Sequence, residues 1–189
     1  DPAKAKEILT AACTAKHGRA CGQLALQNMA EFAAAGQQLP ENDRSMEMLQ
    51  AGCTAGDADS CYELARMCYD GYGVEQDYGQ AASFFDLACD AGHAQGCADY
   101  AAMYANGDGV TADYARTAKG HRRSCDLGEA SGCMALAQMF EVGAGVAKDE
   151  ARAKILRAQA CDGGVKEACE GAAEPPPSKG KRQPKLDAE

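Results

Sequence analysis

Residues 89–97 read CDAGHAQGC, which places two cysteines eight positions apart with a glycine between them. The same spacing occurs five times in the chain, and successive pairs follow one another after 40, 36, 36 and 36 residues. The five pairs are Cys13 and Cys21, Cys53 and Cys61, Cys89 and Cys97, Cys125 and Cys133, and Cys161 and Cys169. A fixed period of this length predicts a solenoid, in which each repeat packs against its neighbours.

A second motif recurs in register with the cysteines. It is Gly-x-Gly-Val, followed three residues after the valine by an aspartate. The copies begin at Gly71, Gly107 and Gly143, and their aspartates are Asp77, Asp113 and Asp149. The first glycine of each copy predicts the left-handed end of one helix, and the aspartate predicts the N-cap of the next. Each repeat is therefore expected to contain helix A before this turn and helix B after it.

Apolar residues in both expected helices recur at helical spacing. Helix A carries Leu64, Ala65 and Cys68, then Tyr100, Ala101 and Tyr104, then Leu136, Ala137 and Phe140. Helix B is expected to bury Ala81, Phe84, Phe85 and Ala88 and, in the last copy, Ala153, Ile155, Leu156 and Ala160. The sequence thus predicts an all-α protein, a right-handed α/α solenoid of tetratricopeptide-like helix pairs.

The solenoid is expected to span residues 1–173, with about five repeats. Asp1 stands in the register of Asp77, so the first repeat is expected to lack its A helix, and an upstream helix and a signal peptide are open possibilities. Residues 36–43 replace the Gly-x-Gly-Val turn in a divergent second unit. Residues 174–189 are rich in Pro and Lys without apolar periodicity, and are expected to form a disordered tail.

Composition restricts the class of protein. The formal net charge of -9 disfavours binding to nucleic acid and to anionic lipid. No stretch approaches the roughly 18 to 20 apolar residues of a membrane span, so no membrane insertion is expected. The 11 cysteines in 189 residues indicate an oxidising compartment.

The paired cysteines are predicted to be disulfides. On one straight helix, residues eight apart lie about 12 Å apart, which exceeds the roughly 4.4 to 6.8 Å between the Cα atoms of a disulfide. A glycine three residues after the first cysteine of four pairs allows the chain to turn there. Each bridge would then join helix B of one repeat to helix A of the next and contribute about 2 to 3 kcal/mol. Reduced cysteines in small core positions are the alternative, and the absence of Cys-x2-Cys disfavours zinc.

Several motif positions together resemble a known family. The segment with Leu64-Ala65, Met67, Gly71-x-Gly73-Val74, Asp77, Ala81-Ala82 and Phe84-Phe85 resembles the Sel-one-like repeat, a relative of the tetratricopeptide repeat. The cysteine pairs make the chain similar to the Helicobacter cysteine-rich protein type, over roughly residues 1–172. The resemblance implies a periplasmic or secreted bacterial adaptor; the mitochondrial intermembrane space is the alternative compartment. It also implies penicillin binding or weak β-lactam hydrolysis as an alternative function.

The resemblance places a protein or peptide ligand in a concave groove formed by the non-core side of the A helices. Tyrosine and arginine on such a face are typical anchors of interfaces, although any one of these residues can also be an ordinary solvated side chain. The candidate residues are Tyr62, Glu63, Arg66, Tyr69, Asp70, Asp99, Ala102, Asn106, Met134, Gln138 and Glu141.

No catalytic residue, metal ligand or cofactor is predicted. A serine β-lactamase needs Ser-x-x-Lys, which places both groups on one helix face, and none of the serines within the predicted repeats begins such a motif. Cys68 occupies the core position of Tyr104 and Phe140, so a buried thiol is favoured over a reactive one. The three histidines, His17, His93 and His121, have no partner at metal-ligand spacing.

One helix B departs from the pattern. Gly120 and His121 replace the aromatic pair of the preceding repeat and are flanked by Lys119, Arg122 and Arg123. This basic cluster is expected either to dock a carboxylate-rich partner or a neighbouring protomer, or to be a solvated and locally relaxed helix.

Overall fold

The structure is a computed structural model that describes residues 2–37 and 44–170. Those residues form helices and contain no strand. The helices are α1 (Pro2–Thr14), α2 (Gly18–Ala34), α3 (Ser45–Thr54), α4 (Ala58–Asp70), α5 (Tyr78–Asp90), α6 (Ala94–Asn106), α7 (Tyr114–Asp126), α8 (Ala130–Val142), α9 (Glu150–Asp162) and α10 (Lys166–Cys169). The even-numbered elements are the A helices, and the odd-numbered ones are the B helices.

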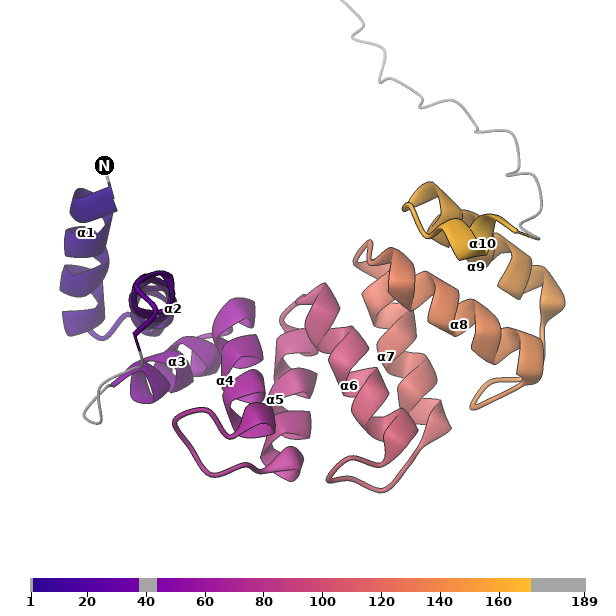
Figure 1. Ribbon diagram of the computed structural model, residues 1–189, viewed down its shortest axis with the longest axis horizontal. Coiled ribbons are helices and arrows are strands. Elements are labelled where there is room, and N and C mark those ends of the chain that lie inside the picture. Colours follow the sequence, from indigo (N-terminus) through magenta and orange to yellow (C-terminus); the bar gives the residue numbers. More distant parts are fainter. Residues whose placement is uncertain (1, 38–43, 171–189) are drawn as a thin grey trace, which may run out of the picture.

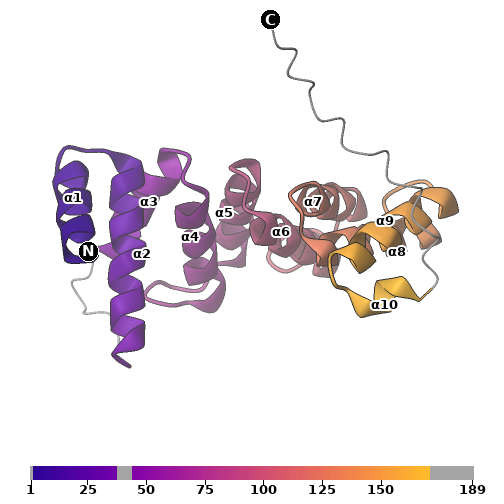
Figure 2. The same ribbon diagram turned by 90° about the horizontal axis from the view of Figure 1, so that it is seen from above.

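The helices follow one another along an arc, with α1 and α10 at opposite ends (Figure 1). Seen from above, the same order holds and each helix lies beside its neighbours in the sequence (Figure 2). Packing is almost entirely between consecutive helices, as in α4 with α5 and α6 with α7. These features confirm the predicted all-α solenoid of helix pairs.

The repeated turns end and begin helices as the motif predicts. Gly71, Gly107 and Gly143 are left-handed, with φ of 70°, 81° and 79°, and each ends an A helix. Asp77, Asp113 and Asp149 then accept hydrogen bonds from free backbone N–H groups at the start of the B helices.

The second glycine of the turn also sets the spacing between repeats. A Cβ on Gly109 would lie 2.3 Å from the Cβ of Tyr78, and one on Gly145 would lie 2.0 Å from the carbonyl oxygen of Tyr114. Both glycines also have positive φ, at 67° and 66°. The turn of one repeat therefore rests on the first residues of the preceding B helix, where a side chain would not fit.

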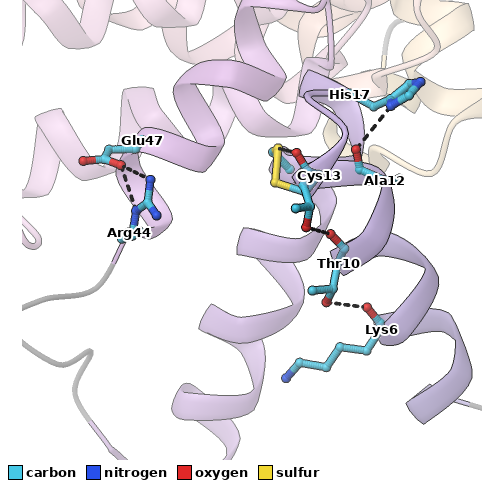
Figure 3. The surroundings of a disulfide bond; sticks show 9 residues. Lys6, Thr10, Ala12, Cys13, His17, Arg44 and Glu47 are labelled. Carbon is cyan, nitrogen blue, oxygen red and sulfur yellow. Dashed lines mark hydrogen bonds and ion pairs between the residues drawn. A yellow bond between two sulfur atoms is a disulfide. The ribbon is translucent and has the colours of Figure 1, made fainter.

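Disulfides join the corners between repeats. All five Cys-x7-Cys pairs are bridged, with Cα–Cα distances of 4.5 to 4.9 Å. Figure 3 shows the first corner, where the Cys13–Cys21 bridge connects α1 to α2 beside His17. The turn residue is a glycine with positive φ in the later corners, whereas Lys16 takes this conformation in the first, at φ 64°.

Small apolar side chains fill the core between the helices. Cys68 is 2% exposed and packs in one cluster with Ala65, Phe85 and Tyr100. The prediction that Ile155 is buried is wrong, because its side chain is 55% exposed. Ile155 shares its register with Ser83 and Lys119, which face solvent, and the core position is taken by Leu156.

Three predictions concern segments that lie wholly or mostly outside the described residues, at the two ends of the chain and at the divergent turn. Helix α2 ends at Ala34, and Gly36 has φ 65°, but the rest of the 36–43 segment lies outside the described residues apart from Gln37. The predicted tail, 174–189, and Asp1 also lie outside them. No described helix has the length and hydropathy needed to cross a membrane.

Candidate functional site

Helix α4 presents one polar and aromatic face beside a buried one. Its buried side consists of Cys61, Leu64, Ala65, Met67 and Cys68. The spacing of Tyr62, Arg66 and Tyr69 by three to four residues brings these side chains to the other side of the helix. The N-cap Asp57, which accepts a hydrogen bond from the N–H of Ser60, fixes where the helix begins.

A cavity of about 540 Å³ lies between α2 and α4. Apolar side chains form most of its wall, and Glu63, Arg66 and Asp70 stand among them. The residues that line it are Leu26, Met29, Ala30, Ala33, Glu63, Arg66, Met67, Asp70, Gly71 and Tyr72. Its size and apolar wall suit a hydrophobic side chain of a partner.

A second cavity, of about 220 Å³, lies between α4, α5 and α6. It is lined by Tyr62, Arg66, Tyr69, Asp70, Phe85, Asp99 and Met103. Because Arg66 and Asp70 line both cavities, the two are neighbours along the A helices. The face therefore has an apolar compartment and an aromatic, charged one side by side.

Ring contacts hold the second cavity in shape. The Tyr62 and Phe85 rings lie 5.7 Å apart, and those of Tyr69 and Phe85 lie 6.5 Å apart. His93 stacks on Tyr62 at 4.0 Å, and Tyr78 meets Tyr69 edge-on at 5.0 Å. These rings have few rotatable bonds and are held by their neighbours, so the cavity is formed before any partner arrives.

Carboxylates set the electrostatics of this cavity. Burial, followed by the charge of Asp99 and a hydrogen bond to it, raises the pKa of Tyr62 to about 12. Burial and then the charges of Asp108, Tyr78, Asp70 and Asp99 raise the pKa of Tyr69. Both phenols therefore remain neutral hydrogen-bond donors in the physiological range.

The predicted face residues on α8 form a separate group. Arg157 of α9 donates to Glu141 from Nε at 2.5 Å and from Nη2 at 3.1 Å, and its guanidinium also lies 3.7 Å from the sulfur of Met134. The hydrogen bond from Arg157 lowers the pKa of Glu141. Gln138 is exposed on the same helix. Asn106 instead donates to Asp108 in the turn after α6, at 3.1 Å.

Sequence reasoning predicted Phe85 to be buried and noted His121, but it did not assign to the site the B-helix residues that lie beneath the A helices. Leu49, Phe85, His121 and Arg157 occupy one position in four successive repeats, spaced by 36 residues. Leu49 is fully buried, Phe85 is 3% exposed, and Arg157 reaches the Glu141 carboxylate. Aligning the repeats on their cysteines is enough to find these four positions. In contrast, no sequence motif marks Leu26 and Met29 as residues of the first cavity.

The basic cluster of α7 is divided between different sides of one continuous helix. Arg123 pairs with Asp90 of α5, and Arg122 lies with Arg152 at a cavity of about 280 Å³ between α7 and α9. Gly120 is buried, and a Cβ there would lie 2.9 Å from the Cβ of Ala101. The expectation of a locally relaxed helix is therefore wrong, because α7 packs closely on α6 at this point.

Three of the described serines donate their hydroxyls to nearby groups of the same chain. Ser60 donates its hydroxyl to Asp57, Ser83 donates to the Gly79 carbonyl, and Ser131 donates to Glu129. Ser124 is completely buried. The chain's one Ser-x-x-Lys spacing, Ser178 to Lys181, lies outside the described residues.

The free cysteine and two of the histidines that were considered for reactive or metal chemistry occupy core or helix-capping positions. Cys68 is the free cysteine, and burial, with a smaller effect of Asp77, raises the pKa of its thiol. His17 and His93 stand at the N-caps of α2 and α6. Within residues 2–37 and 44–170, no three His, Cys, Asp or Glu side chains gather as metal ligands.

Three consecutive segments, residues 58–93, 94–128 and 130–165, match the Sel1 repeat family, and together they make up more than half of the chain. No curated protein sequence matches the chain.

Solved structures share the architecture. Protein c5321, a protective antigen of uropathogenic Escherichia coli with an SLR fold, is 24% identical at a TM-score of 0.72, and the match covers 87% of this chain and 34% of that one. The present chain thus spans about a third of the length of that protein.

Two shorter structures match at nearly their full length. A Sel1 repeat protein from Oxalobacter formigenes is 29% identical at a TM-score of 0.62, with 68% of this chain and 96% of that chain covered. Helicobacter pylori cysteine rich protein B is 26% identical at a TM-score of 0.51, with 66% and 95% covered.

Proposed function

The chain belongs to the Sel1 repeat family, and we propose that it is a non-enzymatic scaffold that binds a protein or peptide along the face of its A helices. Members of this family are generally protein-interaction scaffolds. A solenoid suits this role because its repeats create an extended surface without requiring a catalytic centre.

The pair of adjoining cavities on α4 is the observation that carries this proposal. Both are open to solvent and share Arg66 and Asp70, so one extended segment can fill them together. Tyr69 is 36% exposed at the second cavity, and Arg66 is exposed between the two. Tyrosine and arginine in such positions combine contact area with hydrogen bonding, which is typical of residues that dominate interface energies.

The working compartment is proposed to be oxidising. Five disulfides at the corners fix the angle between successive helices only where thiols stay oxidised. A periplasmic or secreted location fits this requirement, and the mitochondrial intermembrane space is the alternative.

Affinity capture with matched variants tests the function. The oxidised full chain is immobilised and exposed to the periplasmic or secreted fraction of its source, and captured proteins are identified by mass spectrometry. A partner is expected whose capture is lost with Arg66→Ala and with Tyr69→Ala. Tyr114→Ala is the control, because Tyr114 is 55% exposed on a B helix away from both cavities. Equal capture by all three variants would refute binding at this face.

A further inference from the structure

Three aromatic residues, Tyr62, Tyr69 and Phe85, line the smaller cavity. Tyr62 and Tyr69 stand two turns apart on α4, and Phe85 of α5 contacts both rings. Their planes are inclined by 54° and 61° to that of Phe85, so these pairs do not stack face to face. His93 covers one face of Tyr62. Aromatic faces that remain open attract cations through the negative charge of the ring quadrupole.

Two carboxylates stand in the same cavity. Asp99 accepts a hydrogen bond from Gln95 at 2.9 Å and forms another with the Tyr62 hydroxyl, and neither of these partners carries a positive charge. Asp70 forms no ion pair within the described part of the chain. Carboxylates beside aromatic rings reinforce the preference for a cation, because the carboxylate charge and the ring quadrupole both attract positive charge.

Arg66 also lines the smaller cavity and offsets only part of this negative charge, because it is one cation beside the two carboxylates of Asp70 and Asp99. Its guanidinium lies 3.4 Å from the carboxylate of Glu63, which lines the larger cavity and not the smaller one. With Arg66 paired in this way, Asp70 and Asp99 leave the smaller cavity with excess negative charge. Burial is the main cause of the raised pKa of Tyr69, and the charges of Asp108, Tyr78, Asp70 and Asp99 add to it.

We propose that the cavity formed by Tyr62, Tyr69, Phe85, Asp70 and Asp99 receives the cationic side chain of a lysine or arginine on the bound partner. The inference rests on the proposed function, since it specifies the chemistry of the partner at the same face. The adjoining cavity, with its wall of Leu26, Met29 and Met67, takes an apolar side chain of the same segment. The partner is thus an extended peptide segment that carries a basic residue close to an apolar one.

Capped amino acids test the pocket directly, because each carries a single side chain of the kind that the partner would insert. The oxidised, ¹⁵N-labelled full chain is titrated separately with the Nα-acetyl amides of lysine, arginine, norleucine and glutamate, and backbone amide shifts are followed. Lysine and arginine are expected to shift Tyr62, Tyr69, Asp99 and Met103 in a saturable way. Norleucine, which lacks only the terminal ammonium of lysine, is expected to shift the residues of the larger cavity instead.

Variants separate a specific pocket from general attraction. Asp99→Asn and Asp70→Asn each keep the shape of the side chain and are expected to weaken lysine binding about three- to fivefold. Tyr69→Leu removes a ring face and is expected to weaken lysine binding while leaving norleucine binding unchanged. Glu7→Gln removes one negative charge from exposed α1 and serves as the control, with no expected effect.

Several results would overturn the inference. Norleucine could bind the smaller cavity as well as lysine does, or glutamate could bind there through Arg66. Glu7→Gln could weaken lysine binding as much as the cavity variants do, or none of the four compounds could shift any amide. Failure of partner capture together with saturable lysine binding would remove the proposed function and leave the pocket. If capture of the partner depends on Arg66 and Tyr69 but lysine does not bind, the proposed function stands and the cation pocket is refuted.

Discussion

His93, the N-cap residue of α6, stacks on Tyr62 of α4, with ring centroids 4.0 Å apart and planes inclined by only 14°. His93 lies inside the turn closed by the Cys89–Cys97 disulfide, and its Nδ1 accepts a hydrogen bond from the Gly96 N–H at 3.0 Å. The same imidazole therefore caps the start of α6 and supports a wall of the smaller cavity. His93 therefore links the corner closed by the Cys89–Cys97 disulfide to the proposed binding face through direct side-chain contact.

Replacing His93 should separate these two roles. His93→Ala loses both the cap and the stacking and should reduce the free energy of unfolding by about 1 to 2 kcal/mol. His93→Asn can still cap the helix and should lose less than about 1 kcal/mol. Urea unfolding followed by circular dichroism measures both values. In a Tyr62→Leu background the cost of His93→Asn should fall to what the contact of His93 with Asp59, at 3.7 Å, contributes, and an undiminished cost there would contradict the stacking contribution.

Removing one corner disulfide should destabilise the chain through its unfolded state. Replacing both Cys89 and Cys97 by Ala should lower the free energy of unfolding by about 2 to 3 kcal/mol, because the unfolded chain regains the freedom of a short closed loop. Cys68→Ala is the control, since it removes a buried sulfur without a cross-link. A loss no greater than twice that of Cys68→Ala, measured by urea unfolding under non-reducing conditions, would show that the two sulfurs act only as core atoms.

His121 should make stability depend on pH. Burial lowers the pKa of its imidazole, and its buried Nδ1 has no hydrogen-bond partner among residues 2–37 and 44–170. Because the folded pKa lies below the unfolded value, the unfolded chain binds an additional proton at acidic pH, and stability falls as the pH drops through about 6.5. His121→Leu, the residue that Leu49 provides at the same position, should remove this loss and add about 1 kcal/mol at pH 7.5. Parallel urea titrations at pH 7.5 and 5.5 measure the difference, and an identical loss in both proteins would assign it to other groups.

Gly120 should tolerate no side chain despite its place in a helix. Alanine favours helices over glycine by about 1 kcal/mol. At this position, however, a Cβ would lie 2.9 Å from both the Cβ of Ala101 and the carbonyl oxygen of Cys97. Gly120→Ala should therefore destabilise the chain, by about 1 to 2 kcal/mol net. Gly79→Ala is the matched control, because the nearest atom there is the Asp77 Oδ1 at 3.3 Å and the change should be near neutral in thermal unfolding. A stabilised Gly120→Ala variant would contradict the close packing of α6 and α7.

The sequence predicted local features of this fold well. The turn at Gly107 and the N-cap at Asp113 follow from residue types that favour these conformations within a few positions. The prediction failed at Ile155, because its apolar side chain occupies the solvent-facing position that Lys119 has in the preceding repeat.

The candidate site was predicted only in part. Tyr62, Arg66 and Tyr69 could be placed on one face of α4 from their spacing alone. That Tyr62 and Tyr69 both contact Phe85, and that Asp99 of the next repeat completes the cavity, depends on how closely α4, α5 and α6 approach one another. No residue spacing encodes that approach.

By itself, the sequence determined where the helices begin and end and how the cysteines pair at the corners, because these features depend on residues fewer than about ten positions apart. It also showed the period directly, as the repeated spacing of its motifs. Only the tertiary structure decided which side chains share a cavity, because those contacts join residues from successive repeats. The apolar cavity between α2 and α4 and the aromatic, acidic one between α4 and α6 exist because packing of small core residues sets the distances between the A helices.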